Sequence, residues 1–226
     1  MKLIFDIETA GYDFENLAPS QQEFIMRYAE KETDAAIREQ ARNDQKRYLS
    51  LYPFTSEIIS IGMLNISSGN TMVLYRGDEE WESEDGRIKY SGGSEEQILN
   101  KFWEYISKVA GIISFNGKHF DAPFLVMRSA MLKIKPSVNI AAAKYRSKNH
   151  IDLQDELSFY GNIRKFNLDF YCHAFGIKSP KTDEFNGMEV RELFKAGKVK
   201  EIAKYNAEDV RATYELYKIW EEFVQG

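Results

Sequence analysis

Two carboxylates near the N-terminus have a spacing that suits metal binding. Asp6 and Glu8 lie at the end of an apolar run, KLIFDI, that is typical of a buried strand. Side chains alternate across a strand, so residues two apart share a face and these two carboxylates project together. Phe5 and Ile7 then point the other way, into apolar packing. Adjacent carboxylates repel each other, and an oxygen-preferring divalent cation such as Mg²⁺ or Mn²⁺ relieves that repulsion.

A third carboxylate lies at a turn in the middle of the chain. An apolar strand ends at Phe115, Asn-Gly turns the chain, and Asp121 opens a helix with Pro123 in its first turn. Aspartate in this position is commonly a helix N-cap. A junction between a strand and a helix is also where α/β proteins place ligands. Both interpretations stay open from these residues alone.

The late segment YNAED places a hydroxyl beside a carboxylate. Tyr205 and Asp209 are four residues apart on the last predicted helix, so their side chains share one face about one turn apart. Such a hydroxyl could orient a metal-bound water. The alternative is a solvated helix edge, and this motif alone favours that alternative.

Taken together, these segments resemble a known family. DIET near the N-terminus, NG-x-x-FD-x-PFL in the middle and Y-x-x-x-D on a late helix resemble the three motifs of the DnaQ-like 3′–5′ exonuclease superfamily. The tyrosine, in place of histidine, is similar to the DEDDy branch. HIDLQDELSFYG and LDFYCHAFGIKSPK resemble the bacterial exonucleases related to the proofreading domain of B-family DNA polymerases. The resemblance covers residues 1–10 and most of 57–220, and it leaves out 15–50.

The resemblance implies a set of catalytic residues. The family's four metal-binding carboxylates fall on Asp6, Glu8, Asp121 and Asp209, and its tyrosine falls on Tyr205. Two divalent cations, Mg²⁺ or Mn²⁺, would make hydroxide from water and stabilise the departing 3′ oxygen. The tyrosine would orient the attacking water and would form no covalent bond.

Further residues are implied as substrate contacts. The family's contacts to the terminal nucleotides fall on Thr9, Asn116 and Phe120, as a contact to the sugar, an amide hydrogen bond and a base-stacking ring. Turn formation by Asn116 and core packing by Phe120 are the alternatives. Lys181 could reach a phosphate or the leaving group. Asp152 and Asp155 could add acidity near the site, although helix capping explains Asp152 equally well.

The pattern of elements predicts an α/β fold. Apolar runs predict strands at 2–7, 57–66, 71–75, 111–115 and 150–153, and helical spacing predicts helices near 95–109, 122–133, 167–175, 187–196 and 198–223. The resemblance implies a ribonuclease H-like fold, with a five-stranded mixed sheet whose first three strands are antiparallel and which helices flank. We expect one domain over residues 1–226.

Residues 15–50 are predicted to form a helical insertion between the first two strands. The segment 20–50 holds six Lys or Arg and six Asp or Glu, and no glycine. Ser20 and Glu23 have the spacing of a capping box after Pro19. The insertion is either a solvated spacer or a lid and substrate guide, because it follows the strand that carries the first two acids.

Composition excludes several classes of protein. The single cysteine, Cys172, rules out a disulfide-stapled scaffold or a cysteine zinc site within the chain. No run approaches the roughly 18 apolar residues of a membrane span, and acids within the first eight residues make a poor signal peptide, so we expect a cytoplasmic protein. A net charge of −5 argues against a surface that wraps nucleic acid everywhere.

Charge is nevertheless segregated along the chain. Residues 131–150 hold five Lys or Arg and no acid, which predicts a phosphate track beside the middle motif, while residues 78–96 hold eight acids against two bases. The hypothesis is therefore a metal-dependent 3′–5′ exonuclease that acts on the 3′ end of single-stranded DNA. An RNA 3′-trimming enzyme and a non-catalytic nucleic-acid-binding module are the alternatives.

Overall fold

One mixed sheet organises the chain. The computed structural model describes residues 1–141, 149–181 and 190–225. Its sheet has seven strands in the order β4-β5-β3-β2-β1-β6-β7. The strands are β1 (Lys2–Gly11), β2 (Ser56–Asn65), β3 (Thr71–Arg76), β4 (Glu80–Glu82), β5 (Ile88–Gly93), β6 (Gly111–Ser114) and β7 (His150–Asp152). The first three pair antiparallel, as the resemblance implies, whereas β6 pairs parallel to β1 and β7 pairs parallel to β6.

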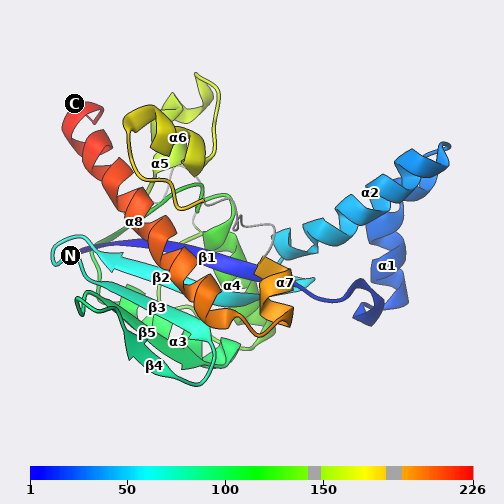
Figure 1. The fold of residues 1–226 in the computed structure, drawn as a ribbon, viewed down its shortest axis with the longest axis horizontal. Coiled ribbons are helices and arrows are strands. Elements are labelled where there is room, and N and C mark those ends of the chain that lie inside the picture. The colour runs from blue at the N-terminus through cyan, green and yellow to red at the C-terminus, as the bar shows by residue number, and fades with distance from the viewer. Residues whose placement is uncertain (142–148, 182–189, 226) are drawn as a thin grey trace.

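Helices cover both faces of this sheet, which makes the fold α/β (Figure 1). On one face α8 crosses β1, β2 and β3, and on the other α3 packs against β2, β3 and β5. None of the helices in the described part of the chain is long and apolar enough to cross a membrane. The helices outside the insertion are α3 (Glu95–Ile106), α4 (Asp121–Met131), α5 (Leu153–Leu157), η4 (Phe159–Gly161), α6 (Leu168–Phe175), α7 (Val190–Lys195) and α8 (Val199–Phe223).

The prediction of five strands is wrong by two. The additional strands, β4 and β5, extend the sheet beyond β3, within the segment that the sequence marks only as acidic. Trp81 of β4 stacks on Tyr90 of β5 with their ring centroids 3.4 Å apart. This edge is short and charged, so its apolar residues do not form the alternating run that identifies a strand in sequence.

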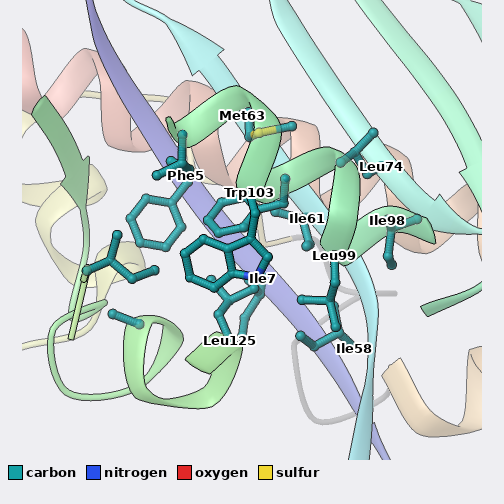
Figure 2. Packing of buried hydrophobic residues seen from close by; sticks show 14 of the residues in the cluster. Phe5, Ile7, Ile58, Ile61, Met63, Leu74, Ile98, Leu99, Trp103 and Leu125 are labelled. Carbon is teal, nitrogen blue, oxygen red and sulfur yellow. The ribbon is translucent and has the colours of Figure 1, made fainter. Parts of the chain in front are cut away.

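Strand β1 is buried on both faces. Leu3, Phe5 and Ile7 pack against α3 and α4 in the largest apolar cluster (Figure 2), as the alternation predicts. Ile4, on the opposite face, packs with residues of α8. Fully burying each such side chain contributes about 1.5–3 kcal/mol. The acids that follow on this strand are therefore held on a rigid element.

The insertion forms an arm at one end of the molecule (Figure 1). Helical elements lie between β1 and β2, over the segment 15–50 for which the sequence predicts an insertion: η1 (Phe14–Asn16), α1 (Pro19–Met26), η2 (Ala29–Lys31), α2 (Ala35–Arg47) and η3 (Tyr48–Leu51). The predicted capping box is misplaced. Helix α1 begins at Pro19, so Ala18 is its N-cap and the Gln21 side chain accepts from the Ala18 N–H at 3.1 Å.

A buried ion pair ties the helices of one face together. The Arg128 guanidinium of α4 donates to both carboxylate oxygens of Glu95 on α3, at 2.8 and 2.5 Å. It also donates to the Pro53 carbonyl, beyond the arm, at 3.1 Å. Glu95 in turn accepts from the Ile58 N–H of β2 at 2.9 Å. One ion pair thus fixes α4, which begins at Asp121, against α3 and the sheet.

We predict that Arg128→Met destabilises the fold by about 3–5 kcal/mol, because it leaves the Glu95 carboxylate buried without its cation. Urea denaturation followed by circular dichroism measures the change. Lys108→Met is the matched control, since Lys108 forms an exposed pair with Glu104, and such pairs contribute about 0.2–1 kcal/mol. Equal losses in the two variants would contradict the role of the buried pair.

Candidate active site

Three carboxylates meet on the face of β1 that α8 covers. Oxygens of Asp6, Glu8 and Asp209 lie within 4.8 Å of one another, and Glu8 and Asp209 are buried. The three residues line an open pocket of about 740 Å³ together with Asp121 and Tyr205. The structure thus brings together the residues that the family resemblance implies, although they are up to two hundred positions apart.

Asp121 reaches this pocket from the edge of β1. Strand β6 pairs with β1 only as far as Ile4, and within the described ranges no other strand pairs with that edge of β1 beyond Ile4. The Asp121 carboxylate accepts the Ile7 N–H there at 3.0 Å. The residue opens α4 as predicted, but the N-cap position belongs to Phe120, so the N-cap interpretation of Asp121 is wrong.

Helix α8 approaches the sheet closely beside the carboxylates. A Cβ on Gly62 of β2 would lie 2.9 Å from Oδ1 of Asn206, so only glycine fits under the helix at this point. Asn206 donates from Nδ2 to Asp6 Oδ2 at 2.7 Å and accepts from Ser60 Oγ at 2.9 Å. Sequence reasoning missed Asn206, and its one signal was its place within YNAED, on the turn between Tyr205 and Asp209.

Burial and mutual repulsion raise the pKa values of these carboxylates. Burial is the larger cause and the neighbouring Asp209 the second for both Asp6 and Glu8, whose pKa values lie well above their usual range. Burial raises the pKa of Asp209 to about 7, with Asp121 adding to the effect and a Glu8 hydrogen bond opposing it. Burial and the same carboxylates raise the pKa of the Tyr205 hydroxyl, so it stays protonated.

The donor set fits a hard cation. Among the residues that the structure describes, no Lys or Arg forms an ion pair with Asp6, Glu8, Asp121 or Asp209. Buried carboxylates are normally paired or bind metal, because an isolated buried charge is costly. Oxygen ligands of this kind suit divalent cations such as Mg²⁺. The group is therefore able to hold a metal ion.

The residues predicted to contact substrate line the same pocket, and these are Thr9, Asn116, Phe120 and Lys181. The Thr9 hydroxyl donates to the Ser50 carbonyl at 2.7 Å, so it fastens β1 to the end of the arm. Phe120 is half-buried and packs against Phe124 with centroids 5.5 Å apart. The Lys181 charge lowers the pKa of Asp209 and so acts against the effect of burial.

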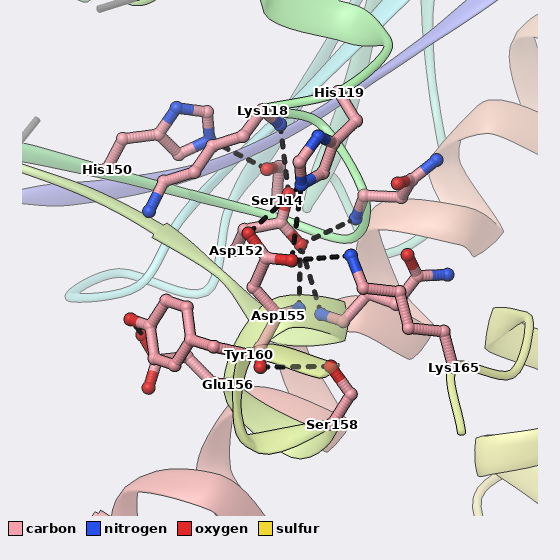
Figure 3. A network of polar contacts seen from close by, with 12 residues as sticks. Ser114, Lys118, His119, His150, Asp152, Asp155, Glu156, Ser158, Tyr160 and Lys165 are labelled. Atoms are coloured by element: carbon pink, nitrogen blue, oxygen red, sulfur yellow. Dashed lines mark hydrogen bonds and ion pairs between the residues drawn. The ribbon is translucent and has the colours of Figure 1, made fainter. Parts of the chain in front are cut away.

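The loop that carries Asn116 is held by Asp152 (Figure 3). The Asp152 carboxylate accepts the Asn116 and Lys118 N–H groups, each at 2.9 Å, and also caps α5 through the Gln154 N–H at 3.0 Å. Asn116 has a φ of 61°, a left-handed conformation in which asparagine is tolerated. Asp152 thus acts as a cap, as one sequence interpretation holds, and fixes the approach to Asp121.

A second group of possible ligands already has partners within the protein. His119, Asp152 and Asp155 lie together, but Asp155 contacts Lys165 at 2.6 Å and His119 at 3.1 Å (Figure 3). Although burial acts in the opposite direction, these two partners hold the pKa of Asp155 below its usual value. Asp155 of this cluster is therefore paired with a cationic side chain, whereas the carboxylates of the active-site pocket form no ion pair with Lys or Arg among the described residues.

The end of the arm belongs to the pocket. Arg47, Ser50 and Leu51 line it beside the carboxylates. A lid and substrate guide was one of two sequence interpretations of the insertion, but the sequence did not single out these residues, because their place depends on how the arm returns to β2. Of the predicted basic track at 131–150, residues 142–148, with three of its five basic residues, lie outside the described part of the chain.

Comparison with known proteins gives consistent matches. The chain is 27% identical over 191 residues to a DNA polymerase of Pyrococcus glycovorans, and the match covers 74% of this chain and 24% of the polymerase. It is 27% identical over 182 residues to DNA polymerase 1 of Saccharolobus solfataricus, and this match covers 70% of this chain and 19% of that protein. The chain thus spans about a quarter or less of the curated relatives it matches.

Solved structures and a family model agree with these matches. The family B DNA polymerase of Pyrobaculum calidifontis has a similar fold, with a TM-score of 0.60 and 17% identity over 97% of this chain and 24% of that one. A family model described as a predicted 3′–5′ exonuclease related to the exonuclease domain of PolB matches residues 55–224, which include Asp121, Tyr205 and Asp209. The chain belongs to this family of PolB-related 3′–5′ exonucleases.

Proposed function

We propose that the chain is a metal-dependent exonuclease that hydrolyses phosphodiester bonds at the 3′ end of single-stranded DNA and acts in the cytoplasm. Residues 1–226 would form one exonuclease domain of ribonuclease H-like fold. The observation that carries this proposal is the convergence of Asp6, Glu8 and Asp209 beside Asp121 without a cationic partner among the described residues. Family membership supports the reaction class.

Five residues of the pocket have catalytic roles in this proposal. Asp6, Glu8, Asp121 and Asp209 would hold two divalent cations, Mg²⁺ or Mn²⁺, which would supply water activation and charge compensation for the leaving 3′ oxygen. The protonated Tyr205 hydroxyl orients the attacking water.

The surrounding residues hold the carboxylates and the substrate. Asn206 fixes the rotamer of Asp6 through its hydrogen bond at 2.7 Å. Phe120 offers a face on which a terminal base can stack. In this proposal Lys181 contacts a phosphate, and Asn116 forms an amide hydrogen bond to the nucleotide; both residues line the pocket.

DNA is preferred as substrate because the curated relatives are DNA polymerases. An enzyme that trims RNA would use the same acids, and contacts to the 2′-hydroxyl would distinguish it. A nucleic-acid-binding module without activity has no need of four unpaired carboxylates, whose mutual repulsion costs stability. A 5′-labelled DNA strand and its RNA counterpart, incubated with Mg²⁺ or Mn²⁺ or with EDTA, separate the three possibilities.

Asp6→Ala should abolish most turnover, by about 10³-fold, because it removes one carboxylate from the charge that holds the cations. Shortening of a 5′-labelled single strand measures the rate, and circular dichroism checks the fold. Asp78→Ala is the matched control, since Asp78 begins another Asp-x-Glu sequence but does not line this pocket. A wild-type rate for Asp6→Ala would refute the site.

Tyr205→Phe should retain the fold and lower kcat by about 10²-fold, the effect of losing one oriented donor. Steady-state kinetics on the same strand measure it, with Tyr214→Phe on the same helix as control. A variant as inactive as Asp6→Ala would show that the hydroxyl does more than orient water, and one as active as wild type would remove it from the reaction.

Asp209→Asn should stabilise the metal-free protein while inactivating it. The folded pKa of about 7 lies above the value of roughly 3.9 in an unfolded chain, so the contribution of Asp209 to stability is present below pH 4 and is lost as the pH rises through 7. At pH 8 in EDTA the variant should gain about 2–4 kcal/mol in unfolding free energy, and the gain should shrink towards pH 5.

In the presence of Mn²⁺ the wild type should become more stable than Asp209→Asn, because the cation stabilises only the protein that binds it. Thermal denaturation measures this. The wild type should gain several degrees in Tm with Mn²⁺ at pH 8, and Asp209→Asn should gain little. Glu208→Gln, one residue away, is the control. A wild-type Tm that ignores Mn²⁺, or an Asp209→Asn variant less stable than wild type in EDTA at pH 8, would count against the metal site.

A further inference from the structure

The arm, defined as residues 14–51, forms part of the wall of the active-site pocket. Arg47, in the last turn of α2, and Leu51, at the end of η3, line the pocket that holds the carboxylates. The hydrogen bond from Thr9 to the Ser50 carbonyl fixes this end of the arm to β1, directly after the first two acids. A substrate in the pocket therefore lies against the arm.

A second pocket of about 710 Å³ lies on the arm and the chain that follows it. Its lining includes Phe24 and Tyr28 from the arm and Tyr52 and Phe54 from the following chain. These four rings are 61%, 61%, 52% and 53% exposed, respectively. Large apolar rings are normally buried, and a group of exposed rings around one hollow marks a binding surface.

The cations beside these rings are not neutralised by acids. The Arg27 guanidinium lies 3.9 Å from the Phe24 ring centroid and 4.6 Å from that of Tyr28, and the Lys31 ammonium lies 5.2 Å from the Tyr28 centroid. Neither cation forms an ion pair with a carboxylate among the described residues.

Two other cations of the arm are paired with acids. Arg42 contacts Glu30 at 2.8 Å and Lys46 contacts Glu15 at 3.1 Å. Arg38 forms no ion pair among the described residues and donates to a backbone carbonyl. Unpaired positive charge thus lies beside the exposed rings, and Arg47, likewise without a carboxylate partner among these residues, adds a cation at the active-site end.

The two pockets adjoin along the chain. Leu51 lines the active-site pocket and the next residue, Tyr52, lines the arm pocket. The active-site pocket thus has Arg47 in its wall, and the arm pocket has exposed rings flanked by cations. Stacking faces for bases and cations for phosphates are the combination that binds single-stranded nucleic acid without regard to sequence.

We propose that the arm binds the single strand upstream of its 3′-terminal nucleotide. Arg47 contacts a phosphate close to the scissile bond, and bases farther along the strand stack on the rings of the arm pocket. This inference rests on the proposed function and extends it. It concerns a part of the chain that precedes the residues matched by the family model, which begin at 55.

The test compares a long oligothymidylate with a thymidine dinucleotide, which is too short to reach the arm pocket. In the double variant Phe24→Ala/Tyr52→Ala, the ratio of kcat/KM on the long strand to that on the dinucleotide should fall about tenfold or more. Both rings are exposed, so the fold should survive, as circular dichroism would check. Phe223→Ala is the control, because this ring is 73% exposed at the end of α8, away from the arm (Figure 1).

Binding is measured separately, by fluorescence anisotropy of the labelled oligothymidylate in EDTA. The double variant should bind about tenfold more weakly than wild type. Arg27→Gln should also weaken binding and reduce its dependence on salt by about one phosphate contact, whereas Arg42→Gln, which removes a paired cation, should not.

The outcomes separate this inference from the proposed function. Equal affinity and an equal kcat/KM ratio in wild type and the double variant would overturn the role of the arm, and would assign its pocket to another partner, such as a protein. Wild-type protein that binds the strand through the arm but cleaves neither substrate with Mg²⁺ or Mn²⁺ would support the arm while refuting the exonuclease.

Discussion

Repulsion among buried carboxylates is the constraint on which the site depends. Asp6, Glu8 and Asp209 share a pocket with Asp121, and burial together with their neighbours raises their pKa values. A fold optimised for stability alone would replace these carboxylates or pair them with cations, since functional sites are where proteins keep residues that lower stability. The same repulsion makes the group receptive to divalent cations, which convert an unfavourable cluster into a binding site.

The surrounding fold holds that cluster in place. Phe5 and Ile7 pack against α3 and hold β1, with its two acids, in the core. Gly62 allows α8 to lie close enough for Asn206 to donate a hydrogen bond to Asp6. The ion pair between Arg128 and Glu95 fixes the helix that begins at Asp121. Hydrophobic burial elsewhere in the domain therefore offsets the cost of assembling like charges.

The loop after β6 and the arm complete the pocket from two sides. Asp152 holds the loop of Asn116 through two backbone N–H groups, and Thr9 ties the arm to β1 through Ser50. Both attachments use a polar side chain and a backbone group, so they fix position without depending on the exact identity of neighbouring residues. The arm thus lies at the edge of the site and contributes no strand to the sheet.

The sequence by itself determined the main strands and the alternation of KLIFDI, because a buried strand imposes that alternation, and it placed Tyr205 and Asp209 on one face of a helix. That the four acids belong to one site was implied by the family resemblance and not by periodicity. The sequence did not show the edge strands β4 and β5, because their segments, EWE and IKYSGG, hold charged residues and glycines and few apolar residues. Only the tertiary structure decided that Asp121 bonds to β1, that Asn206 supports Asp6, and that Arg47 lines the pocket. Each of these depends on how distant segments approach in space, and local periodicity carries no record of that approach.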